Sequence, residues 1–172
     1  MWVRPPPEPL HLLAVMNKKE LTEKLIIRLR EKKAGLLESR NNYRKTSNEA
    51  MGATQSRSDT TKFQTGKLAE NIENQLEKIE RIILDIEELG DKKFDAVQIG
   101  SLIKLEGAGK ISYLLIVPNG AGGETIKDKN TVVQTVAAES PLGKTLTLKK
   151  VGDNIKFEAP AGTKEIKILS IK

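Results

Sequence analysis

Residues that could carry out chemistry are few in this chain, and they are scattered. The sequence has no Cys and a single His, His11, so it offers no thiolate metal site, cysteine nucleophile or Ser-His-Asp triad. Gly143-Lys144-Thr145 resembles the end of a phosphate-binding loop, but Ala138 stands where that motif needs its first Gly. Glu87 and Glu88 lie among many other acids, as on a solvated helix face. These patterns predict no active site within the chain.

Composition narrows the class of protein further. The 172 residues hold 29 Lys and Arg against 23 Asp and Glu, a net charge of +6, and only 3% are aromatic. Few rings are therefore present to stack the bases of a single-stranded nucleic acid. No apolar run approaches the roughly 18 residues that span a bilayer. We expect one or two small domains in a cytoplasmic protein that does not associate with membranes and whose partner presents an acidic surface.

Residues 1–15 do not resemble a folded domain. Four prolines and Glu8 precede a short apolar run from Leu10 to Val15, which is too brief for a signal peptide and lacks a small-residue cleavage site. We expect this segment to be a disordered leader or a misassigned start, with Met16 as the alternative start.

Residues 16–90 show helical periodicity on both sides of a polar break, which begins at Gly52. Apolar residues recur at intervals of three and four, and in the second half they approach a heptad seam. The first set is Leu21, Leu25, Ile26, Leu29 and Leu36; the second is Leu68, Ile72, Leu76, Ile79, Ile83, Ile86 and Leu89. Gly90 provides a stop. This pattern predicts an antiparallel coiled-coil hairpin with its tip near residues 52–63.

The charges of the two predicted helices are opposite. Residues 16–50 carry a net charge of +5 and residues 68–95 carry −5. We therefore expect the helices to pair with each other. Exposed pairs each contribute only about 0.3–0.5 kcal/mol, so the apolar seam must supply most of the adhesion. The alternative interpretation is that each charged run only solvates its own helix.

Residues 91–172 change to the two-residue period of strands. Strands are predicted at 97–105, 111–117, 131–137, 154–158 and 165–171, with a hairpin loop at 120–123. Ser140-Pro141 predicts an N-cap and first residue for a short helix that reaches Leu148. The expected fold class is α+β, in which the helical hairpin precedes a compact antiparallel β-rich domain with one short helix.

Several stretches of this C-terminal region resemble the GreA/GreB transcription elongation factors, in the same order and spacing and after a helical hairpin. They are VQIGSLIKL (97–105), ESPLGK (139–144), KKVGD (149–153) and PAG (160–162) with EIKIL (165–169). The family's Gly before the two lysines is Leu148 in this chain. The resemblance covers roughly residues 17–172.

The resemblance implies a fold and a partner. It implies an FKBP-like C-terminal domain that docks on RNA polymerase near its secondary channel, with Ser140, Pro141 and Leu142 as the docking residues. The hairpin would enter that channel, so nucleic acid is met only within the transcription complex. The FKBP-like fold also suggests prolyl isomerisation, but fold alone does not establish function, and few aromatic residues are present to line such a pocket. We expect a monomer without a cofactor of its own.

The hairpin tip departs from the family pattern. In cleavage-competent members two tip carboxylates help to hold a catalytic Mg²⁺, which suits oxygen ligands. Here Asp59 occupies one acidic position and Ser56 the other, while Arg57 and Lys62 add positive charge and Phe63 replaces a tyrosine. A hydroxyl does not supply the charge of a carboxylate, so we expect no metal site, with Asp59 as its weak candidate. Mg²⁺ would enter only as part of the polymerase centre.

Three functional hypotheses result. The leading one is a polymerase-binding elongation factor, similar to short Gre-like proteins without the full acidic tip. It would not be an enzyme itself and would stimulate transcript cleavage weakly or not at all. The second is an active cleavage factor with atypical tip ligation. The third is a basic coiled-coil protein that binds nucleic acid independently of polymerase, with strong salt dependence.

Overall fold

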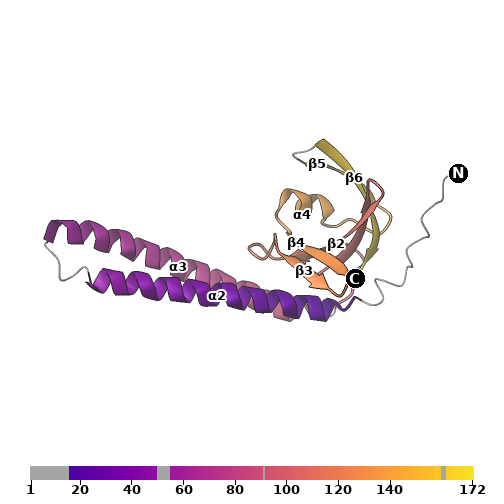
Figure 1. Cartoon of the computed structure of the whole chain (residues 1–172). Coiled ribbons are helices and arrows are strands. Elements are labelled where there is room, and N and C mark those ends of the chain that lie inside the picture. The colour runs from indigo at the N-terminus through magenta and orange to yellow at the C-terminus, as the bar shows by residue number, and fades with distance from the viewer. Residues whose placement is uncertain (1–15, 50–54, 91, 160–161) are drawn as a thin grey trace.

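A computed structural model shows a long helical hairpin joined to a six-stranded sheet (Figure 1). It describes residues 16–49, 55–90, 92–159 and 162–172, and the side chains of these except residues 47, 49, 55–62 and 159. The predicted leader at 1–15 and part of the predicted tip at 50–54 lie outside the described residues. None of the described helices combines the length and the apolar character needed to cross a membrane.

The hairpin consists of α2 (Lys18–Glu49) and α3 (Gln55–Leu89), which lie side by side and antiparallel (Figure 1). The predicted seam is buried over most of its length, at Leu21, Leu25, Ile26, Leu29, Ile72, Leu76, Ile79, Ile83 and Ile86. The prediction is wrong at Leu68, which is 43% exposed, because the facing part of α2, residues 41–46, offers only exposed side chains.

The start of α3 also differs from the expectation. Residues 55–61, expected to belong to the connection, form the first turns of this helix. They contain neither Gly nor Pro, and the helix propensities of Ser, Thr, Gln and Asp lie within about 0.7 kcal/mol of Ala. A polar composition alone therefore does not end the helix.

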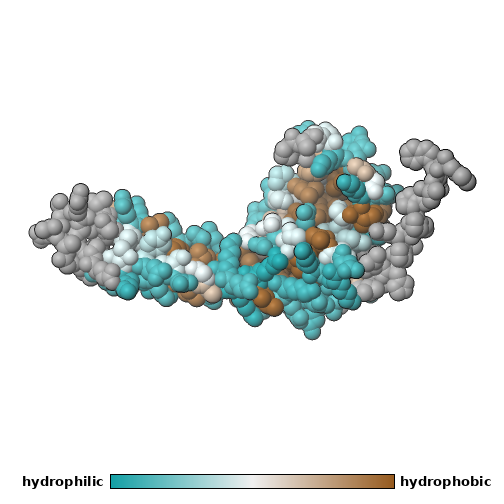
Figure 2. Space-filling view, in the orientation of Figure 1, coloured by the Kyte–Doolittle hydropathy of each residue, from teal (hydrophilic) through white to brown (hydrophobic). Residues whose placement is uncertain are grey.

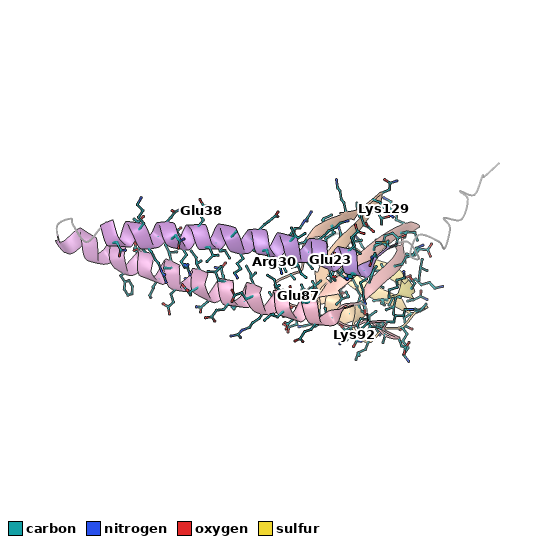
Figure 3. All side chains as sticks on the ribbon, turned by 90° about the horizontal axis from the view of Figure 1, so that it is seen from below. Glu23, Arg30, Glu38, Glu87, Lys92 and Lys129 are labelled. Carbon is teal, nitrogen blue, oxygen red and sulfur yellow. The ribbon has the colours of Figure 1, made fainter. Side chains whose placement is uncertain are left out.

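Ion pairs join the two helices along their length, which confirms the pairing expected from the opposite charges. Every one of these pairs has its cation on α2 and its acid on α3. Figure 3 shows one of them, Arg30 and Glu87, on the facing helices. The nitrogen–oxygen distances are 3.0 Å for Arg30–Glu87, 2.5 Å for Lys33–Glu80, 3.1 Å for Arg40–Glu73 and 3.3 Å for Arg44–Glu73.

The contributions of the apolar seam and of the ion pairs to the free energy of unfolding can be measured separately. We expect Leu76→Ala to lower the free energy of unfolding by about 2–5 kcal/mol, because Leu76 is 6% exposed and its removal leaves a cavity. We expect Glu73→Gln to cost less than about 1 kcal/mol, since the Glu73 side chain is 44% exposed and only its partner Arg40, at 21%, is partly buried. Urea unfolding followed by circular dichroism measures both. Equal losses would show that charge holds the hairpin together.

The sheet has the strand order β3-β4-β2-β1-β6-β5. Four of its strand pairs are antiparallel, but β2 and β4 run parallel, with Tyr113 opposite Val133, so the prediction of a wholly antiparallel sheet is wrong there. After β2, residues 118–130 cross to the sheet edge, form β3 and turn back into β4. Strand β4 therefore lies between β3 and β2 in the sheet. The strands are β1 (Leu102–Gly107), β2 (Lys110–Val117), β3 (Thr125–Asp128), β4 (Thr131–Ala137), β5 (Asn154–Ala159) and β6 (Gly162–Ile171).

Three further strand predictions differ from the structure. Strand β6 begins at Gly162 rather than Glu165. Strand β3 was not predicted, because its four residues contain one apolar side chain, Ile126, and show no period by themselves. Strand β1 begins at Leu102 rather than Val97. Gly100 has a φ of +93°, and an added Cβ there would lie 3.0 Å from the Leu89 side chain, so the chain turns beside the end of α3 before the strand begins.

Strand side chains alternate between two cores. On one face of the sheet, Leu102 and Leu115 pack in the same cluster as the base of the hairpin. On the other face, Ile103 and Leu114 join a second cluster that contains Leu146 of the short helix. This alternation follows from the pleat, because successive residues of a strand point to opposite faces. In Figure 2 hydrophobic surface gathers on the sheet domain, while most of the visible hairpin surface is hydrophilic.

Polar contacts fasten the sheet edge to the hairpin. The Lys24 ammonium lies 3.3 Å from a carboxylate oxygen of Asp128, which is 4% exposed. Arg28 lies 3.3 Å from Glu124 and donates a hydrogen bond to the Thr125 carbonyl. Together with the shared apolar cluster, these contacts hold β3 against α2 and fix the direction in which the hairpin projects.

Candidate functional site

The predicted docking residues lie at the start of α4 (Pro141–Leu146). Ser140 is its N-cap, with extended backbone angles of −64° and 158°. The Ser140 hydroxyl donates to the Ala137 carbonyl at 2.7 Å and accepts from the Gly143 amide at 3.0 Å. Such a cap satisfies one of the free amides of the first turn. Ser140 therefore positions the helix, and its hydroxyl is already engaged.

The next two residues differ in exposure. Pro141 is exposed and occupies the first helical position, where its missing amide leaves no hydrogen bond unmade. Leu142 is half-buried and packs against the second core cluster. Of the three predicted docking residues, only Pro141 is thus exposed, while Ser140 and Leu142 are half-buried.

Gly143 allows α4 to approach the end of β4 closely. A Cβ at this position would lie 2.1 Å from the Ala137 carbonyl oxygen and 2.7 Å from that of Ala138. Both atoms belong to the backbone and do not rotate away. The close approach seats Ser140 directly on the Ala137 carbonyl.

A shallow hollow of about 310 Å³ lies beside this helix start, between α4 and the loop from β2 to β3. Gly122 packs on β4 so closely that a Cβ would lie 2.6 Å from the Ala137 amide nitrogen. Thr135 braces the same loop, donating to the Ala121 carbonyl and accepting from the Glu124 amide, both at 2.9 Å. The prediction of a hairpin at 120–123 is wrong, because this loop joins β2 to β3, and β4 lies between those two strands in the sheet. The sequence also gives no sign that the loop borders the predicted docking residues, since that depends on the register of β2 and β4.

A second exposed segment follows α4. The lysines at 149 and 150 are exposed, and Leu148 and Val151 are 76% and 55% exposed. Gly152 has a φ of +94°, and the Asp153 carboxylate accepts a hydrogen bond from the Lys150 amide at 2.8 Å. The KKVGD motif thus forms a tight turn that presents two lysines.

Leu148 stands where the family pattern has Gly, and this difference should affect the stability of the domain. Its φ is +66°, in the left-handed region that costs an L-residue roughly 1–2 kcal/mol and glycine almost nothing. Because the side chain is 76% exposed, little packing offsets this cost. We expect Leu148→Gly to raise the free energy of unfolding by about 1 kcal/mol, measured by thermal unfolding. Leu148→Ala provides the control, since alanine keeps the strain and should give no such gain.

The predicted tip lies at the far end of the hairpin from α4 (Figure 1). The backbone of Ser56, Arg57, Asp59 and Lys62 belongs to the first turns of α3, and their side chains lie outside the described part of the structure. Phe63 is 64% exposed, and the ammonium of Lys67 lies 4.6 Å from its ring centroid. Among the side chains that the structure describes, no three His, Cys, Asp or Glu groups converge on a metal position.

The molecule therefore offers two separated candidate surfaces. One is the start of α4 with its neighbouring glycine loop, on the sheet domain. The other is the exposed end of the hairpin, marked by Phe63. The hairpin spaces these surfaces, because α3 alone has 35 residues and is about 52 Å long at 1.5 Å per residue.

Comparison with known proteins identifies the class to which this architecture belongs. The family model described as "Transcription elongation factor, GreA/GreB, C-term" matches residues 91–172. Transcription elongation factor GreA of Clostridium acetobutylicum is 30% identical over 168 residues, covering 96% of this chain and 89% of that protein. GreA of Clostridium kluyveri is 29% identical over 166 residues, covering 95% and 87%.

The chain belongs to the GreA/GreB family of transcription elongation factors. The predicted resemblance is thereby confirmed, and the matched region contains both α4 and the KKVGD turn. Among solved structures, GreA factor homolog 1 (Gfh1) of Thermus thermophilus is similar, with 20% identity and a TM-score of 0.36. That alignment covers 86% of this chain and 94% of the Gfh1 chain.

Proposed function

We propose that this protein binds RNA polymerase through the start of α4 and places the hairpin tip in the secondary channel, where it modulates elongation with little or no stimulation of transcript cleavage. It acts in the cytoplasm as a monomeric polymerase cofactor and is not an enzyme itself. The observation that carries the proposal is the capped α4, which holds Pro141 exposed on the domain that matches the family.

The cross-helix ion pairs argue against a free nucleic-acid binder. Four cations of α2 already lie within ion-pair distance of acids on α3. Binding to bare DNA depends on cations that are available to neutralise phosphates. These four cations of the hairpin are therefore less available to neutralise DNA phosphates, which favours a polymerase partner.

Capture of the protein by immobilised core RNA polymerase tests the proposed binding. We expect retention at moderate salt, with bare double-stranded DNA beads retaining much less. Retention on DNA alone, lost steeply as salt rises, would instead support the independent nucleic-acid binder. A folded protein that neither matrix retains would refute the proposal.

A cleavage assay on backtracked elongation complexes tests the tip. We expect little acceleration by the natural protein, and a gain on Ser56→Asp, because a second carboxylate near Asp59 supplies the charge that Mg²⁺ ligation needs. Ser56→Asn is the matched control, of similar size and without charge. Strong cleavage by the natural protein would instead support the active factor with atypical ligation.

A further inference from the structure

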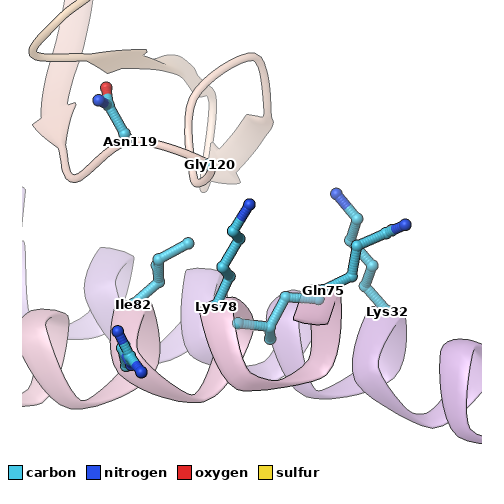
Figure 4. Close-up of a pocket in the computed structure, with 8 residues that line it drawn as sticks. Lys32, Gln75, Lys78, Ile82, Asn119 and Gly120 are labelled. Atoms are coloured by element: carbon cyan, nitrogen blue, oxygen red, sulfur yellow. The ribbon is translucent and has the colours of Figure 1, made fainter. Parts of the chain in front are cut away.

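A second cavity, of about 500 Å³, lies where the hairpin meets the sheet domain. Its floor is the side of α3 that carries Ile82, and its roof is the loop after β2 that carries Asn119 and Gly120. Figure 4 shows the Lys78 side chain rising from α3 towards that loop, with Lys32 of α2 on the same side. Segments far apart in the sequence therefore line this junction groove, which is open to solvent.

One end of the junction groove is formed by a close contact between the loop and α3. A Cβ at Gly120 would lie 2.7 Å from the Ile82 Cδ1 atom, so the loop touches α3 closely at one end of the groove. Ile82 is 7% exposed and belongs to the cluster shared by the hairpin and the sheet. Its burial explains why a residue outside the predicted seam is apolar. The groove is thus a built feature of the domain junction.

The charge around the junction groove is positive. Lys32, Lys78 and Arg81 line it, and no carboxylate does so among the residues that the structure describes. Arg81 lies 4.0 Å from Glu77 in a pair exposed on both sides. Neither Lys32 nor Lys78 forms an ion pair with a described residue. Three cations around one cavity raise the local concentration of anions that carry several charges.

We propose that the junction groove binds a polyphosphate group. A cavity of this volume lies in the range of small-molecule sites, which is 300–1,000 Å³. Lys ammonium groups and an Arg guanidinium are suited to phosphate oxygens, as point charges and as a planar fork respectively. The group could come from free pyrophosphate or from the tail of a nucleotide. The amides of Gln75 and Asn119 and the apolar Ile82 favour the nucleotide, because they can contact a nucleoside.

Isothermal titration calorimetry on the free protein tests the proposal without polymerase. Three probes separate the sources: ATP, inorganic pyrophosphate and adenosine. We expect saturable binding of ATP, equal or weaker binding of pyrophosphate, and none of adenosine. The test variant is Lys32→Gln with Lys78→Gln. The matched control is Lys19→Gln with Lys110→Gln, which removes the same charge at exposed positions that do not line the groove.

The test variant is expected to weaken ATP binding at least tenfold, and the control less than twofold. Equal losses in both variants would overturn the proposal, since binding would then follow net charge alone. Adenosine binding as tight as that of ATP, or no saturable binding of either phosphate probe, would also overturn it. Thermal unfolding verifies that both variants fold. If the double variant does not fold, the single variants Lys78→Gln and Lys19→Gln are compared instead. We expect Lys78→Gln to weaken ATP binding at least threefold, and equal losses in the two single variants would overturn the proposal.

Discussion

Replacing Pro141 with Asp is expected to reduce capture of the protein by core RNA polymerase more than tenfold while leaving its thermal unfolding nearly unchanged. Pro141 is exposed, so the domain core does not depend on it. An Asp in the first turn of a helix is also favoured by the helix dipole. In a complex, however, the new carboxylate would be buried against a partner without a group prepared to pair with it, which is costly.

The comparison variant for this experiment is Asn130→Asp. Asn130 is exposed in the turn between β3 and β4, and the change adds the same charge at nearly constant side-chain size. We expect its polymerase capture to match that of the natural protein. If Pro141→Asp is captured equally well, the start of α4 is not the docking surface. The exposed KKVGD turn then becomes the next surface to test.

Much of the hairpin was predictable because its information is local. The recurrence of Leu25, Leu29, Ile72 and Leu76 at helical intervals states which faces are buried, and the structure buries them. The opposite charges of the two segments likewise predict the cross-helix pairs. Local sequence does not state how far the seam extends, since the burial of Leu68 depends on what the other helix places opposite it. That is why the seam ends earlier than predicted.

The pairing of the strands in the sheet could not be predicted from local sequence. The strands from 111–117 and 131–137 were predicted within a residue, but their parallel pairing was not, because it depends on the path of residues 118–130 and on β3. A four-residue strand with one apolar side chain cannot be distinguished from a loop by its own pattern. Ile126 is nevertheless 1% exposed, in the core shared with the hairpin.

The two candidate sites differ in the same way. Ser140 and Pro141 form a local capping signal, so the sequence predicts the helix start. The docking role of these residues is implied only by the family resemblance. The junction groove combines Lys32, Lys78 and Asn119 from three segments, and no spacing within any one segment reports that they meet. Only the packing of α3 beneath the β2–β3 loop brings them together.

Gly143→Ala is expected to lower the free energy of unfolding by about 2–3 kcal/mol. In a helix, alanine is normally the better residue by roughly 0.5–1 kcal/mol, so propensity alone predicts stabilisation. At this position the added Cβ would lie 2.1 Å from the Ala137 carbonyl oxygen, and α4 must move away from β4 to make room. Overpacking of this kind costs about 1–3 kcal/mol and occasionally more. The steric cost therefore reverses the sign.

Gly35→Ala is the matched control, because Gly35 lies within α2 and an added Cβ there meets no atom within 4 Å. It should raise the free energy of unfolding by about 0.5–1 kcal/mol. Opposite signs at the two glycines in urea unfolding would show that contact with β4, and not helix propensity, requires Gly143. The same displacement pulls Ser140 from the Ala137 carbonyl and moves Pro141, so Gly143→Ala should also lose polymerase capture, whereas Gly35→Ala should keep it. A stable Gly143→Ala variant that polymerase still captures would mean that docking does not depend on the seating of α4.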